Sequence, residues 1–189
     1  LFSPFATGAG VPGLMAHLGH EWVIVANLFA LLVGFALLSN HFEQSHVPAL
    51  LPKFLPDDWK GAFVLLVLVF VMSAFLDNIA AAMIGGTVAA AVFKKRVHIG
   101  YLAAIVAASN AGGAGSVVGD TTTTMMWIDG VSPVQVFPAY VASVVAVVIF
   151  GIPAARMQHR LQPMLRHAHE RVAVDWIRVG IVLLILLSA

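Results

Sequence analysis

The stretch SNAGGAGSVVGDTTTT at residues 109–124 decides how this chain folds, because it separates two apolar runs by a glycine-rich segment. A glycine in a helix interior is about 1 kcal/mol less favourable than alanine. Four glycines fall within eight positions here, at 112, 113, 115 and 119. A continuous helix is therefore not expected, although the flanking runs favour helix. We predict a broken helix over residues 99–128, made of two half-helices joined by irregular backbone.

The composition around this stretch is typical of a membrane protein. Of 189 residues, 60% are hydrophobic and only 10% are charged, whereas about 25% of a soluble domain is charged. These values exclude a soluble enzyme domain and a disordered tail. The absence of cysteine excludes disulfides and thiol chemistry, and a net charge of +1 without a basic face argues against nucleic acid as a partner. Because the apolar runs are continuous rather than alternating, helices rather than a barrel should span the lipid bilayer.

The remaining apolar segments complete an all-α integral membrane fold. Residues 62–93, interrupted only by the charge of Asp77, are too long for one crossing of about 20 residues and short for two. We therefore predict a re-entrant hairpin with its tip at Asp77. Further helices are predicted at residues 22–39 and 134–152, and the start of another at 176–189. The chain, residues 1–189, is interpreted as one transmembrane domain that is a fragment of a longer protein.

The basic residues predict the orientation in the membrane. Residues 1–21 contain neither Lys nor Arg, whereas Lys94, Lys95 and Arg96 are the only Lys or Arg residues between positions 61 and 152. By the positive-inside rule, the loops at 40–60, 94–98 and 153–175 should be cytoplasmic and residues 1–21 should lie outside. Two very short full crossings in place of the hairpin would give the same sidedness. We expect the cytoplasmic (inner) membrane of a bacterium as the location.

Two carboxylates inside apolar sequence are the strongest candidates for chemistry. Asp77 and Asp120 each stand at a predicted helix break. A carboxylate at the bilayer centre costs about 2.5–3.5 kcal/mol by insertion scales, and such residues usually mark an ion or proton path. The alternative is that each Asp only caps the half-helix that follows it, which its position also allows. Both roles can hold together.

The surroundings of the two carboxylates favour a cation over an anion. Two helix N-termini at the midplane would suit an anion, but an Asp already occupies each of them. Unwound backbone carbonyls, the amides of Asn78 and Asn110 and the threonines from Thr121 onward add neutral oxygens. Hard oxygen ligands of this kind suit sodium or a proton. No other metal and no organic cofactor is expected.

The motif DNIAAAMI at residues 77–84 and the motif SNAGGAGSVVGDTTTTMMWIDG at residues 109–130 together resemble the ion transporter superfamily. Within it, the likeness is greatest to sodium/proton antiporters of the NhaD type and to citrate transporters. The resemblance implies two inverted repeats, each with a re-entrant hairpin and a broken helix, whose tips meet at the substrate site. This chain would supply one repeat. The partner would be the second repeat of the same protein, and a homodimer is conceivable.

The resemblance also implies a set of cation- and substrate-binding residues. They are Asp77, Asn78, Ser109, Asn110, Gly112, Gly113, Asp120, Thr121 and Thr122. Dicarboxylate transporters of the superfamily carry a Ser-Asn-Thr signature at each tip. The first tip here reads Asp77-Asn78-Ile79 instead, a departure that favours the antiporter branch.

Three functions remain open from the sequence. The first is sodium/proton antiport, in which Asp77 and Asp120 bind the two ions in competition. The alternative is a cation-coupled carrier of citrate or a related carboxylate, with sodium or a proton as the coupling ion. A membrane scaffold without transport is the third. An enzyme is not expected, because the buried stretches contain no nucleophile with a neighbouring base.

Overall fold

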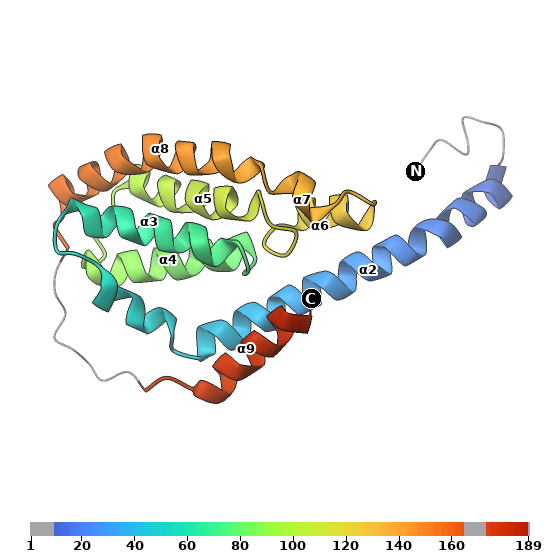
Figure 1. The fold of residues 1–189 in the computed structure, drawn as a ribbon, viewed down its shortest axis with the longest axis horizontal. Helices are drawn as coiled ribbons and strands as arrows, with labels where there is room; N and C mark the ends of the chain where they lie inside the picture. Colours follow the sequence, from blue (N-terminus) through green and yellow to red (C-terminus); the bar gives the residue numbers. More distant parts are fainter. Residues whose placement is uncertain (1–9, 165–172, 189) are drawn as a thin grey trace. The chain divides into compact units, whose positions relative to one another are not determined.

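The computed structural model describes residues 10–164 and 173–188, and all regular elements in these ranges are helical (Figure 1). The chain divides into two compact units, Leu1–Ala36 and Leu37–Ala189. The elements are α2 (Gly10–Gln44), the 3-10 helix η1 (Pro48–Phe54), α3 (Trp59–Ser73), α4 (Asn78–Val92), α5 (Ile99–Gly113), α6 (Thr121–Ile128), α7 (Pro133–Val136), α8 (Ala139–Leu161) and α9 (Trp176–Ser188).

Two helical segments are long and apolar enough to cross a bilayer, Val25–Gln44 and Pro133–Leu161. Only 11% of the most apolar part of each is buried within the protein. Large apolar side chains therefore point away from the protein interior along both helices, as expected when lipid is the solvent. Helix α2 extends beyond the predicted bounds of 22–39 in both directions, and residues 1–9 lie outside the described part of the chain.

The segment expected to form a hairpin consists of two helices, α3 and α4, with the break at residues 74–77. Each helix has 15 residues, which corresponds to about 22 Å at 1.5 Å per residue. A bilayer core is about 30 Å thick, so neither arm is long enough to cross it alone. The structure thus shows two short helices joined at Asp77, and their re-entrant placement in the membrane stays a prediction.

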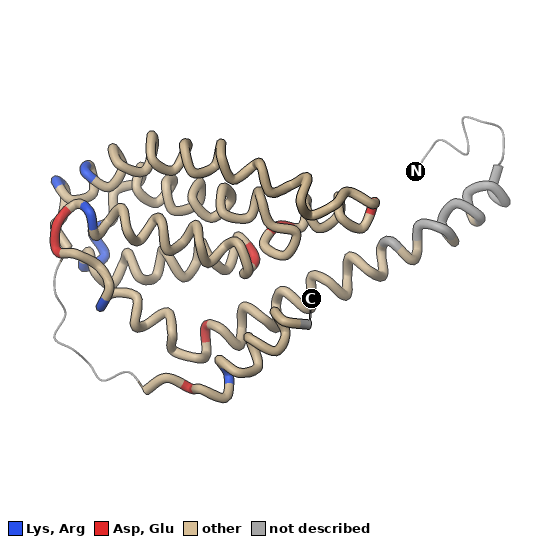
Figure 2. Tube along the Cα trace, viewed as in Figure 1, with Lys and Arg blue, Asp and Glu red and all other residues tan. Residues whose placement is uncertain are grey.

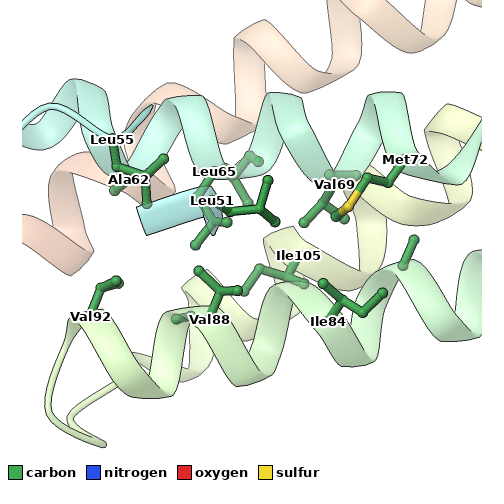
Figure 3. Packing of buried hydrophobic residues seen from close by; sticks show 14 of the residues in the cluster. Leu51, Leu55, Ala62, Leu65, Val69, Met72, Ile84, Val88, Val92 and Ile105 are labelled. Carbon is green, nitrogen blue, oxygen red and sulfur yellow. The ribbon is translucent and has the colours of Figure 1, made fainter. Parts of the chain in front are cut away.

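Helix α5 lies at the centre of the second unit, where it packs against α3, α4 and α8. The core between these helices is mainly apolar, and Figure 3 shows Val69 of α3, Ile84 and Val88 of α4 and Ile105 of α5 within it. The fully buried Tyr101 donates its hydroxyl to the backbone oxygen of Ala62 at 2.6 Å. A buried phenol needs such a partner, and the bond fastens α5 to the start of α3.

The second half of the chain differs from the predicted bounds in two places. The expected helix over 134–152 is a short helix, α7, followed by α8, which begins after Pro138 and continues through Pro153 to Leu161. A proline inside a membrane helix is tolerated where neighbouring groups accommodate the backbone, so Pro153 does not end the helix. The first part of the loop expected at 153–175 is therefore helical, and residues 165–172 lie outside the described ranges.

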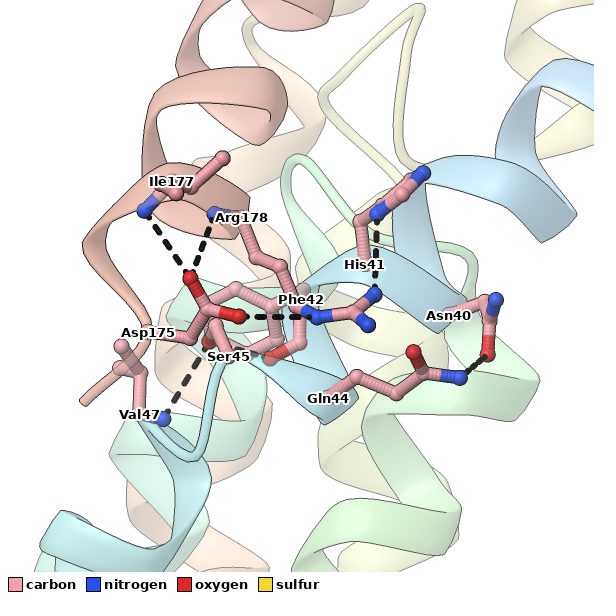
Figure 4. A network of polar contacts seen from close by, with 9 residues as sticks. All are labelled: Asn40, His41, Phe42, Gln44, Ser45, Val47, Asp175, Ile177 and Arg178. Atoms are coloured by element: carbon pink, nitrogen blue, oxygen red, sulfur yellow. Dashed lines mark hydrogen bonds and ion pairs between the residues drawn. The ribbon is translucent and has the colours of Figure 1, made fainter. Parts of the chain in front are cut away.

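The loop expected at 40–60 is also largely helical, because α2 runs to Gln44 and η1 follows. Figure 4 shows how this segment meets the start of α9. Asp175 caps α9, accepts from Arg178 Nε at 3.1 Å and donates its backbone N–H to the oxygen of Ser45 at 3.0 Å. These contacts fix the start of α9 beside the end of α2, including His41 at 3.5 Å from the guanidinium of Arg178.

Candidate functional site

The carboxylate of Asp77 caps α4. Its Oδ2 accepts hydrogen bonds from the backbone N–H groups of Ile79 at 3.1 Å and Ala80 at 3.4 Å. Asp is a preferred residue for this position because a helix leaves its first N–H groups without partners. The side chain is half-buried, and its Oδ1 receives none of these bonds. One oxygen of the carboxylate thus serves the helix.

Asp120 has the equivalent role at the second break. Its Oδ1 accepts from the backbone N–H of Thr122 at 3.1 Å, and the residue is also half-buried. Both carboxylates therefore occupy helix N-termini, as the sequence predicts. Within the described residues, neither carboxylate forms an ion pair with Lys or Arg.

Side-chain hydroxyl groups hold the loop at residues 114–120 in place by hydrogen bonds to its backbone. Thr123 donates to the backbone oxygens of Ser116 and Asp120, and Thr124 donates to those of Val117 and Asp120. The hydroxyl of Ser116 accepts from the N–H groups of Val118 and Gly119, both at 3.2 Å. Irregular backbone at membrane depth needs such internal partners, because lipid supplies none.

The same loop is pressed against the end of α3. Ser116 Oγ donates to the backbone oxygen of Ala74 at 2.6 Å, which joins the loop to the hairpin tip. A Cβ on Gly119 would lie 2.0 Å from the backbone oxygen of Ser73, and one on Gly112 would lie 2.0 Å from that of Phe70. Glycine is thus required at both positions by close backbone approach.

A direct bond between two predicted site residues connects the hairpin to the broken helix. Asn78 Nδ2 donates to Asn110 Oδ1 at 2.9 Å, and Asn110 Nδ2 donates to the backbone oxygen of Val106 at 2.8 Å. The structure also brings Gly113 against Asp120, since a Cβ on that glycine would lie 3.0 Å from the Asp120 Cβ. The predicted residues therefore gather at two adjoining helix breaks.

The other predicted residues have more local surroundings. Ser109 is 1% exposed and donates its hydroxyl to the backbone oxygen of Val106 in its own helix. Gly112 and Gly113 are buried at packing contacts. Thr121 is half-buried and Thr122 is exposed at the start of α6.

Sequence reasoning missed Ser116, and it treated Thr123 and Thr124 as oxygen ligands of a cation rather than as the residues that organise the loop. A hydroxyl residue at a helix break is a common cap or turn residue, and that signal was present in the sequence. It also missed Ser73, whose hydroxyl is fully buried at the end of α3 with no hydrogen-bond partner among the described residues.

Basic residues are concentrated at one end of the bundle, together with the acidic pair Asp57 and Asp58. Figure 2 shows its Lys and Arg residues gathered at one end, where α4 ends and α5 begins. Asp77 caps the start of α4 and Lys94 follows its end, so the two are about 25 Å apart along the helix axis. The break at Asp77 is therefore remote from the basic end of the bundle.

Comparison with known proteins identifies the family of the chain. The sequence model of the family described as "CitMHS: Citrate transporter" matches residues 5–189. Neither the curated proteins nor the solved structures include a significant match to the chain. The match spans nearly the whole chain and includes both helix breaks. The chain therefore belongs to the CitMHS citrate transporter family, a family of integral membrane secondary transporters and not of enzymes.

Proposed function

We propose that this chain forms the cation-binding half of a cation-coupled citrate carrier. The observation that carries the proposal is the pair of half-buried carboxylates, Asp77 and Asp120, at two adjoining helix breaks in a member of a citrate transporter family. Each carboxylate uses one oxygen as a cap. The other oxygen of each, with the amides of Asn78 and Asn110, supplies ligands for sodium or a place for a proton.

The charge of the substrate requires such a cation. Citrate has three carboxyl groups and is multiply anionic at neutral pH. Two like charges 4 Å apart repel by about 4 kcal/mol at an effective dielectric constant of 20. Citrate should therefore bind beside Asp77 and Asp120 only after sodium or a proton has neutralised them. That order of binding would couple citrate movement to the cation gradient.

The site would be completed by a second hairpin and broken helix. The family resemblance assigns this role to a second repeat of the same protein, and a second copy of the chain is the alternative. Motion of one repeat against the other would give alternating access to the site.

Transport in proteoliposomes tests the proposal. Labelled citrate is offered outside vesicles that contain the protein, under an imposed sodium gradient or an imposed proton gradient. Asp77→Asn and Asp120→Asn keep a capping side chain but remove the charge, so the folded protein should persist while citrate uptake falls at least about tenfold. Asp129→Asn is the matched control, because Asp129 is exposed at the end of α6.

Sodium/proton antiport without citrate is the second candidate, favoured by the Asp77-Asn78-Ile79 tip. The same vesicles distinguish it when they hold a pH-sensitive dye. Proton movement driven by sodium alone, and lost in Asp77→Asn, would replace the citrate carrier by an antiporter. Citrate uptake that is unchanged in both Asn variants would remove the two carboxylates from the coupling site.

A further inference from the structure

Six basic residues gather at the end of the helical bundle opposite the two helix breaks. We call them the basic collar. They are Lys60 at the start of α3, Lys94, Lys95 and Arg96 between α4 and α5, and Arg156 and Arg160 in the last turns of α8. All six are exposed, and Figure 2 shows the blue segments together at this end. The collar lies outside the site proposed for transport.

A buried glutamine fixes the two main parts of the collar to each other. Gln158 is 0% exposed, accepts from the backbone N–H of His98 at 2.7 Å and donates to the backbone oxygen of Arg96 at 3.1 Å. The loop at residues 94–98 is thereby tied to α8 between Arg156 and Arg160, which are one turn apart on the same helix face. The side chain of Gln158 thus fixes the backbone that carries these two parts of the collar.

The ring of Trp59 connects Lys60, the third part of the collar, to Arg156. The guanidinium of Arg156 lies 4.6 Å from the ring centroid of Trp59, the residue before Lys60. A cation over a tryptophan face is held by about 0.5–2 kcal/mol. Tryptophan is also the side chain that concentrates at the boundary between hydrocarbon and headgroups. Trp59 therefore indicates the level of the headgroups in the fold.

Two residues of the collar adopt a backbone conformation that does not suit lysine. Lys94 has φ 50° and Lys95 has φ 61°. Lys95 donates its backbone N–H to the oxygen of Ala90 at 2.7 Å, which ends α4 as a left-handed helix cap. Glycine or asparagine is the usual residue in such a cap, and an unsuited side chain costs about 1 kcal/mol. The geometry of the turn therefore does not explain why both of these positions are lysine.

Basic residues outnumber acidic ones at this end of the bundle, where Asp57 and Asp58 lie beside the six basic residues of the collar at the start of α3. Lys60 forms an ion pair with Asp58 at 3.9 Å. Met157 and Leu161 alternate with the arginines of α8 and are 45% and 42% exposed. Basic groups therefore stand beside apolar side chains on one surface.

We propose that the basic collar binds the headgroup of an anionic phospholipid. The phosphate would lie against Lys94, Lys95 and Arg160, and the acyl chains would cover Met157 and Leu161. This chemistry selects a lipid over a soluble anion because the surface offers apolar contact next to the charge. Basic residues near a membrane surface gain about 1 kcal/mol each from anionic lipid, which is about fivefold in affinity.

Lipid binding to the purified protein in mild detergent tests the proposal. Fluorescent phosphatidylglycerol and phosphatidylcholine with the same acyl chains are titrated at fixed ionic strength, and their dissociation constants are compared. Phosphatidylglycerol should bind at least about tenfold more tightly. Equal affinity for the two lipids would overturn the proposal.

Three substitutions at one position separate charge from geometry. Lys95→Gln should weaken phosphatidylglycerol binding about fivefold, and Lys95→Arg should retain it. Lys95→Gly should weaken binding equally while raising the thermal midpoint, because glycine suits the left-handed cap. The stabilised glycine variant excludes unfolding as the cause of lost binding.

The last part of the test is competition between soluble anions and the lipid. Inorganic phosphate and citrate are added at millimolar concentration, with chloride adjusted to keep the ionic strength constant. Phosphatidylglycerol should remain bound. Its displacement by either anion, or affinity that is unchanged in Lys95→Gln, would show that the collar is not a lipid site.

Discussion

The two helix breaks of this chain are built differently. The hairpin tip at residues 74–77 is short. Within it, the side chain of Asp77 accepts the hydrogen bonds that cap α4. The loop at 114–120 is stabilised by hydrogen bonds between the side chains of Ser116, Thr123 and Thr124 and backbone groups. It also lies against the backbone of α3. The bond from Ser116 to Ala74 then connects the two. We infer that the loop is the scaffold and that the tip takes its position from it.

This comparison has a consequence for transport. If the loop positions the tip, the hairpin and the broken helix of one repeat should move together when the carrier changes conformation. Substitutions in the loop should then be more damaging than substitutions in the tip.

Gly119→Ala should be the most destabilising change at the breaks. The new Cβ would lie 2.0 Å from the backbone oxygen of Ser73, and backbone atoms cannot move aside cheaply. Overpacking of this kind costs about 3 kcal/mol, which lowers the thermal midpoint in detergent by about 6–12 °C. Gly86→Ala in α4 is the matched control, because no atom lies within 4 Å of its added Cβ. Alanine favours helix there, so the control should be neutral or stabilising by up to about 1 kcal/mol.

Ser116→Ala should destabilise the protein by about 2 kcal/mol. It removes the donor to Ala74 and leaves the N–H groups of Val118 and Gly119 without their acceptor. The matched control is Thr87→Ala, which removes a single bond to the backbone oxygen of Met83 on an exposed helix face. Equal thermal midpoints for the two variants would contradict the scaffold role of the loop.

At the tip, removing the cap and removing the charge should have separate effects. Asp77→Ala should cost about 1 kcal/mol of stability, whereas Asp77→Asn should change it by only a few tenths, because asparagine is an equally good cap. Thermal midpoints of the two variants measure this difference. A large loss of stability in the Asn variant would show that the negative charge itself holds the tip.

The smallest effect should come from the bond between the two breaks. A double-mutant cycle of Asn78→Ala and Asn110→Ala should give a coupling energy of about 0.5–1 kcal/mol, as for one hydrogen bond at an exposed site. A cycle of Asn78→Ala with Thr87→Ala should be additive, since these residues are more than two turns apart on α4. Additivity in the first cycle would show that the amide contact does not connect the breaks.

Local sequence was enough to predict where the helices break. Asp77 and Asp120 stand where an N-cap is expected, and the glycines before Asp120 make a continuous helix unfavourable. The ends of the helix after residue 133 were less predictable. The predicted helix ended at residue 152, but α8 continues to Leu161, where its last turns contact a loop far away in sequence through Gln158.

The sequence by itself determined that lipid is the solvent of this protein, that its fold is helical and where the two carboxylate-bearing breaks lie. Composition and cap residues act locally, so these features can be predicted without the tertiary structure. The tertiary structure alone decided which groups meet at those breaks. Ser116 reaches Ala74, Gly119 approaches Ser73, and Asn78 bonds Asn110, although their partners are far apart in the chain. Such contacts depend on how α3, α4 and α5 pack, and packing is a property of side-chain shapes across the whole bundle rather than of any single stretch.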